Sequence, residues 1–249
     1  MLAADPGATG VAWRRIADQL PRPRGILVVS AHWMTPGPAV SATALPETIH
    51  DFYGFPEALY RLTYPAPGAA TLANEIRELI PEVAIDPRRG LDHGAWVPLR
   101  SMYPQADVPV IQMAVMPEAT PEAHFRLGQR LAPMASSGIL IIGSGGLTHN
   151  LRDISDLPEG QALAYVAEFS TWFRDALERR DHEALFDYRR QAPHALRAHP
   201  SEEHLLPIFV ALGAASANRS PGNLPASAYQ GFTAGALAMD AFIFAPATT

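Results

Sequence analysis

The chain has 249 residues, of which 48% are hydrophobic and 18% are charged, and its formal net charge is −6. This composition supports a sizeable buried core and excludes a disordered chain, while the absence of cysteine excludes disulfides, thiolate metal sites and cysteine nucleophiles. No basic run indicates a nucleic-acid surface, and no run of about 18 apolar residues indicates a membrane span, so we expect neither partner.

The opening residues, MLAADPGATG, contain an acid and no basic segment, which is not typical of a signal peptide. We therefore expect a cytoplasmic protein by default, and the sequence leaves the oligomeric state open. Helical periodicities and short apolar runs then alternate along the chain. They predict helices over residues 8–20, 69–80, from about 94, and 121–136, and strands over 25–31, 83–86, 108–116 and 138–143.

Residues 42–70 mix aromatics with proline and glycine and are typical of a functional loop. Further along, residues 160–190 are helical in pattern, and 201–215 predict a helix with Ser201 as its N-cap. Residues 228–245 indicate one or two strands. Buried strands that alternate with helices predict an α/β fold: a single three-layer domain over 1–249, with a largely parallel or mixed central sheet flanked by helices.

Two histidines lie where apolar strands end. His32 lies near the end of the run GILVVSAHWM, and His149 lies near the end of GILIIGSGGLTHN. Ligands of open α/β sheets bind beyond the carboxyl ends of the strands, so these positions favour a shared site, although each histidine alone is also compatible with a buried ring bonded to a backbone carbonyl. The segment GSGGLTH lacks the lysine of a phosphate loop, and we expect its glycines to let the backbone turn tightly and approach a ligand.

Two more histidines are weaker candidates. His93 follows Asp92 in the segment LDHGAW and is placed to reach into a cleft. His204 is expected in the first turn of the helix over 201–215, where the helix N-terminus favours the neutral ring that binds metals, whereas the preceding Glu202 and Glu203 oppose this effect. A solvated or capping role is an equal alternative for both.

The remaining histidines are expected to need no special account, except that His50 lies in the aromatic loop and is a candidate for lining a pocket. The aromatic residues Phe52, Tyr53 and Phe55 either wall that pocket or anchor the loop. We expect His124 to be structural within an amphipathic helix, and His182, His194 and His199 to be solvated.

Five segments, in this order, carry a resemblance to a known family: ILVVSAHW, TIHDFYGFPEALYRLTYPAPG, LDHGAWVPLRSMYP, GSGGLTHNL and HPSEEHLLPIFVALGAA. Together they resemble the LigB-like class III extradiol ring-cleaving dioxygenases, and among these the 4,5-DOPA dioxygenase subgroup. The likeness covers nearly the whole chain and is weakest over 155–198.

The resemblance implies an α/β fold with one non-haem metal, expected to be Fe(II), with Zn(II) as another occupant. The iron form cleaves a catechol ring beside its hydroxyls with O2. By motif, His32 and His204 match metal ligands, and His149 matches a histidine that is a ligand in the DOPA-type proteins and the acid/base in other relatives. His93 matches a histidine that hydrogen-bonds near the oxygen or the substrate.

The family normally opens with a strand ending in His-Gly-Ser-Pro, whose histidine is a ligand, and the residues just after it resemble MLA at the start of this sequence. We therefore expect the first strand and its histidine to be missing, through a late start, a trimmed chain or a true loss, the last of which would weaken iron binding and activity.

Two alternatives stay open on the sequence. One is a zinc metallohydrolase that uses the same histidines, with Glu202 or Glu203 as an added ligand. The other is a non-catalytic homologue that lacks a full ligand set.

Overall fold

A five-stranded sheet forms the centre of the computed structural model, which describes residues 7–216 and 226–244. The strand order is β3-β2-β4-β1-β5, and only the contact of β2 with β4 is antiparallel. The sheet is therefore mixed and mostly parallel, as predicted. Its strands are β1 (Gly25–Met34), β2 (Ala39–Ser41), β3 (Ala84–Asp86), β4 (Val110–Val115) and β5 (Ile139–Ser144).

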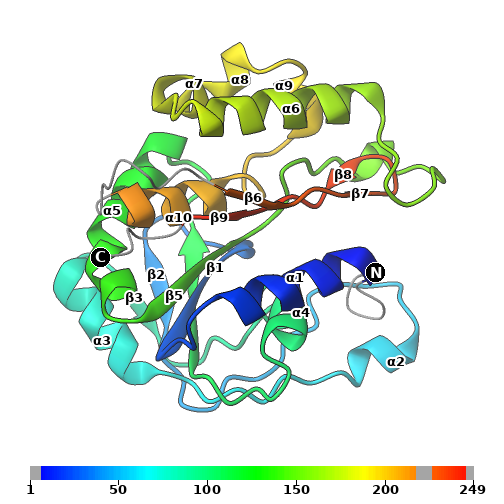
Figure 1. Cartoon of the computed structure of the whole chain (residues 1–249). Helices are drawn as coiled ribbons and strands as arrows, with labels where there is room; N and C mark the ends of the chain where they lie inside the picture. Colours follow the sequence, from blue (N-terminus) through cyan, green and yellow to red (C-terminus); the bar gives the residue numbers. More distant parts are fainter. Residues whose placement is uncertain (1–6, 217–225, 245–249) are drawn as a thin grey trace.

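Helices cover both faces of this sheet (Figure 1). Leu27 and Val29 of β1 pack with α3, α5 and α10 on one face, while Ile26 and Val28 pack with α4 on the other. Because both faces of β1 are buried, its sequence is a continuous apolar run rather than an alternating one. The helices are α1 (Gly7–Gln19), α3 (Ala70–Leu79), α4 (His93–Met102), α5 (Pro121–Ser136) and α10 (Leu206–Ser216).

A separate group of helices, at the top of Figure 1, packs around its own apolar cluster, which includes Phe169, Phe173 and Tyr188. These helices are α6 (Ala164–Glu178), α7 (His182–Phe186), α8 (Tyr188–Gln191) and α9 (Ala195–Ala198). Two short segments complete the list, α2 (Glu57–Tyr60) and the 3-10 helix η1 (Leu151–Asp153). None of the helices in the described ranges is long and apolar enough to cross a membrane.

The C-terminal segment differs from the one or two strands predicted. It forms two small antiparallel pairs, β6 with β9 and β7 with β8, because turns divide the apolar stretch into short pieces. Residue 245 of the predicted range lies outside the described residues. The strands are β6 (Ala226–Tyr229), β7 (Phe232–Thr233), β8 (Leu237–Ala238) and β9 (Ala241–Ile243).

The helix predicted over 201–215 begins later, at Leu206. Ser201 does not cap it, since its hydroxyl donates to Glu203 Oε1 at 3.0 Å. Proline is favoured in the first turn of a helix and has no N–H to donate to a carbonyl one turn earlier, so Pro207 accounts for the later start. His204 therefore lies in the turn before α10, not in the helix.

A buried ion pair attaches the C-terminal segment to α6. Arg174 Nη1 lies 2.7 Å from Asp240 Oδ1, and the side chains are 13% and 0% exposed. Burial raises the pKa of Asp240, while the hydrogen bond from Arg174 opposes that rise. The carboxylate therefore depends on its one arginine.

We expect Arg174→Met to lower the free energy of unfolding by about 3–5 kcal/mol, because it leaves a buried carboxylate unpaired. Arg126→Met, which breaks an exposed pair with Glu122 on α5, is the control and should cost less than about 1 kcal/mol. Chemical denaturation at neutral pH measures both, and equal losses would contradict the expectation.

Candidate metal centre

The structure brings together the four histidines that the sequence singled out. The ring of His32 lies 3.8 Å from that of His93 and 4.9 Å from that of His204, measured between centroids. His149 stacks on His204 at 3.4 Å with an interplanar angle of 8°. The rings thus form a row in the order 93, 32, 204, 149.

The four rings come from separate segments of the chain. His32 is near the end of β1, and His149 is in the loop after β5. His93 is the first residue of α4, and His204 is in the turn before α10. These segments meet at the carboxyl ends of β1 and β5, where ligands of open α/β sheets bind.

A carboxylate flanks each end of the row. The donor atoms of His32, Asp51 and His93 lie within 4.8 Å of one another, and so do those of His149, Glu203 and His204. The trio implied by the resemblance, His32, His149 and His204, is therefore divided between two groups.

Asp51 was not anticipated from the sequence. Its Oδ1 accepts the backbone N–H of His93 at 2.9 Å, and its Oδ2 lies 3.0 Å from His93 Nδ1 and 3.7 Å from His32 Nδ1. Burial acts to raise the pKa of Asp51, but the hydrogen bonds from His93 outweigh it and leave the pKa lowered. Asp51 is a single acid in an aromatic loop, and no motif spacing in the sequence predicts its contact with His93.

Of the two acids proposed for a hydrolase, Glu203 is the one beside the histidines. Glu202 accepts the Tyr188 hydroxyl at 2.9 Å instead and lies 3.6 Å from Arg189. The two neighbouring acids thus have different partners.

Two glycines allow the segments to approach so closely. A Cβ on Gly94 would lie 2.5 Å from Ser30 Oγ and 2.9 Å from the His32 ring. A Cβ on Gly145 would lie 2.1 Å from the His204 carbonyl oxygen. At Gly145 the backbone packs on the turn that carries His204, while the approach of these glycines to a ligand stays a prediction.

The buried setting keeps three of the site histidines neutral. Burial, together with the nearby His93, lowers the pKa of His32 to about 4. Burial also lowers the pKa of His149, and it lowers that of His204 well below its ordinary value. Metals bind the neutral imidazole, so these rings are in the binding form at neutral pH.

His199 was expected to be solvated, and this was wrong. The side chain is 0% exposed, its Nε2 lies 2.8 Å from the Leu147 carbonyl oxygen, and it packs against Phe169 and Tyr188. Its burial follows from the packing of α6 and α8, which the local sequence does not show. His199 lies close to the site, since the carbonyl oxygen of the preceding residue, Ala198, accepts the backbone N–H of His149 at 2.9 Å.

The other histidines divide as follows. His124 is buried, with both ring nitrogens near backbone groups, which confirms a structural role. His194 is exposed beside Glu168, as expected, whereas His182 is half-buried with its ring 4.9 Å from that of Phe125.

The aromatic loop is anchored by Phe52, which also contacts a site histidine, while its role in walling a pocket stays a prediction. Phe52 is 6% exposed and sets its ring edge-on to that of His93 at 5.7 Å, so it anchors the loop and borders the site. Tyr53 and Phe55 are 88% and 40% exposed. His50 lies 2.9 Å from the Leu62 carbonyl oxygen and packs on Trp96, so it holds the loop in place.

The family model for the catalytic LigB subunit of aromatic ring-opening dioxygenase matches residues 11–238. The chain belongs to the LigB family. A 4,5-DOPA dioxygenase extradiol from Beta vulgaris is 45% identical over 202 residues, covering 79% of this chain and 75% of the relative. The protein of that name from Escherichia coli K12 is 36% identical over 209 residues, covering 82% and 77%.

Among solved structures, the uncharacterized protein JW3007 from Escherichia coli K12 is similar, with a TM-score of 0.77, 30% identity, and coverage of 93% of this LigB chain and 90% of that one. The predicted family and the α/β fold are confirmed. The chain is an aromatic ring-opening dioxygenase related to proteins named as extradiol enzymes, which gives the hydrolase alternative no support. The residues MLA, on which the expectation of a missing strand depends, lie outside the described residues.

We expect the metal-free LigB protein to lose stability as the pH falls from 6.5 towards 4. Burial lowers the pKa of His199 to about 4, so the unfolded chain binds the proton first, and the stability present above 6.5 is lost on acidification. Each such histidine contributes about 1.4 kcal/mol per pH unit within this window.

Denaturation in EDTA at several pH values measures this effect. His199→Gln should have a shallower dependence than the wild type, while the exposed control His194→Gln should follow the wild type. Parallel curves for all three proteins would contradict the assignment of this titration to His199.

Proposed function

We propose that this LigB protein is a metal-dependent extradiol dioxygenase that cleaves a catecholic ring with O2. His32, His204 and His149 would hold the metal, and His93 would handle a proton or hydrogen-bond beside it. The observation that carries the proposal is the row of four imidazoles at the carboxyl ends of β1 and β5, in a chain of the ring-opening family.

The donor set fits the metal that the family implies. It offers neutral imidazoles and carboxylates without thiolates, which suits Fe(II) and also Zn(II). His204 contacts both His32 and His149, so it is the ligand common to the two halves of the row. We propose Fe(II) as the working metal because the reaction of the family uses O2.

When bound, the metal would orient the two hydroxyls of the catechol and O2 and let electron density pass between them. The residues around it supply the rest. Phe52 borders His93 with an apolar ring edge, which limits water on that side. The aromatic loop also offers a surface that suits an aromatic substrate.

His93 is suited to proton transfer by its neighbour. The Asp51 carboxylate lies 3.0 Å from Nδ1, which favours the proton on that nitrogen and leaves Nε2 to take a second one. In this role His93 accepts the proton of a substrate hydroxyl and later returns one. His149 is the alternative acid/base if two imidazoles and a carboxylate complete the ligand set.

Anaerobic loading with Fe(II), followed by air and L-DOPA, should give a yellow ring-opened product. His32→Ala and His204→Ala should retain no iron after desalting, whereas the exposed control His194→Gln should retain as much as the wild type. Metal analysis and absorbance measure both effects. An iron-loaded wild type that leaves a panel of catechols unchanged would overturn the proposal.

His93→Gln should separate proton transfer from metal binding. We expect it to bind iron as the wild type does and to lower kcat by about 100-fold or more, since general acid–base catalysis contributes at least that much. Metal analysis and steady-state kinetics test this together. Loss of iron from the variant would make His93 a ligand instead.

A further inference from the structure

A buried carboxylate lies beneath two of the site histidines. Asp92 is 0% exposed, and three side chains donate hydrogen bonds to its carboxylate. Ser30 Oγ donates to its Oδ1 at 2.7 Å, Arg89 Nη2 donates to its Oδ2 at 2.8 Å, and Gln112 Nε2 donates closely to the same Oδ2. A buried carboxylate is costly unless it is paired and hydrogen-bonded, and these donors meet that requirement for Asp92.

Asp92 is connected to His32 through both backbone groups of that histidine. The N–H of His32 donates to Ser30 Oγ at 3.2 Å, and its carbonyl oxygen accepts from Arg89 Nη2 at 3.5 Å. The pairing of β1 with β4 shifts register between Ser30 and Met34. His32 therefore lies in an irregular part of the strand, where the side chains of Ser30 and Arg89, and not a neighbouring strand, form hydrogen bonds with its backbone.

Asp92 is also connected to His93, the next residue. Asp92 is the N-cap of α4, and its Oδ1 accepts the Ala95 N–H at 3.2 Å. Its own N–H donates to Gln112 Oε1 on β4 at 3.1 Å. The start of α4 is thus tied to β1 and β4 through one carboxyl group.

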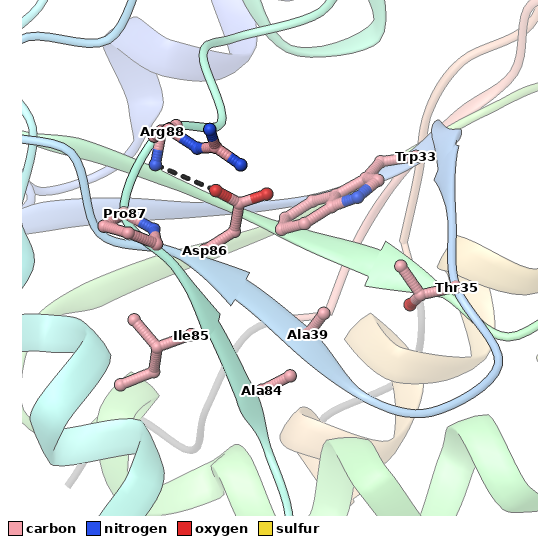
Figure 2. Close-up of a pocket in the computed structure, with 8 residues that line it drawn as sticks. All are labelled: Trp33, Thr35, Ala39, Ala84, Ile85, Asp86, Pro87 and Arg88. Carbon is pink, nitrogen blue, oxygen red and sulfur yellow. Dashed lines mark hydrogen bonds between the residues drawn. The ribbon is translucent and has the colours of Figure 1, made fainter.

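The arginine of this group is held in place by its loop. Asp86 Oδ1 accepts the backbone N–H groups of Arg88 and Arg89 at 2.8 and 3.0 Å. Figure 2 shows the first of these bonds, at a surface pocket of about 570 Å³ that is also lined by Trp33. The Arg89 guanidinium lies 5.1 Å from the centre of the Trp33 ring, a cation–π distance.

We infer that Asp92 is a positioning residue for the ring-opening reaction, which sets the spacing of His32 and His93 by holding β1 and α4 to one carboxylate. This inference rests on the proposed function. In this role Asp92 contacts neither substrate nor metal. Asp92 instead keeps the rings of His32 and His93 3.8 Å apart.

A neutral amide cannot replace this group. Asp92 uses both oxygens as acceptors, so asparagine would place an NH2 donor against Arg89 and Gln112, or against Ser30 and Ala95. Asp92→Asn keeps the size of the side chain but removes its charge opposite Arg89 and changes its hydrogen bonding. Ser30→Ala is the milder change, because it removes the single bridge between Asp92 and the N–H of His32.

Matched controls exist for both changes. Asp240 is a second 0%-exposed carboxylate paired with an arginine, and Asp240→Asn controls for Asp92→Asn. Ser41 is a second buried strand serine, 2% exposed, whose hydroxyl accepts the Gln112 N–H at 2.9 Å, and Ser41→Ala controls for Ser30→Ala.

The test is titration of each full-length protein with Co(II), followed by visible absorption, with kcat and KM measured on the Fe(II) form. We expect Asp92→Asn to weaken Co(II) binding and lower kcat by about 10–100-fold each, to change the Co(II) spectrum, and to leave KM within about threefold. Ser30→Ala should act in the same direction to a smaller extent. The two controls should lose stability but keep the spectrum and kcat of the wild type.

The inference would be overturned if each variant matched its control in Co(II) spectrum, Co(II) affinity and kcat, and the proposed function would then still stand. The pairs to compare are Ser30→Ala with Ser41→Ala, and Asp92→Asn with Asp240→Asn. If Asp92→Asn fails to fold, the serine pair decides. A wild type that neither binds Co(II) nor opens a catechol would overturn the proposed function, and the inference with it.

Discussion

The double burial of β1 is the constraint on which the rest of the structure depends. Its side chains enter two separate cores, one with α3, α5 and α10 and the other with α4, so the strand cannot slip or turn without exposing both. This fixes the place where β1 ends and its neighbours converge. His32 is held there because the strand before it has no freedom to move.

Gathering four imidazoles and two carboxylates in one place requires that they do not repel one another. Burial lowers the pKa values of His32, His149 and His204, so the rings stay neutral and can pack face to face or edge to face. The same desolvation that would oppose a cluster of charged rings keeps these three rings in the neutral form, which is the form that binds metals. Asp51 and Glu203, at the two ends, supply negative charge where that cation would need it.

Local pattern and motif predicted much of this arrangement. The bounds of α5 match residues 121–136 because its periodicity is strong and local, and the family motifs indicated the four histidines. What could not be predicted depends on tertiary packing. The burial of His199 results from α6 and α8, the approach of Asp51 to His93 crosses from a loop to a helix, and the late start of α10 reflects Pro207 overriding an N-cap pattern.

The four rings come from the first strand, the middle of the chain and the turn before the last long helix. They span residues 32–204, and His204 lies directly before α10, so the cluster forms only when α10 docks against the sheet. A cation that binds the cluster would favour the native state over the unfolded one by mass action. Saturation with the proposed metal would therefore measure how much of the protein in a sample has completed its long-range folding.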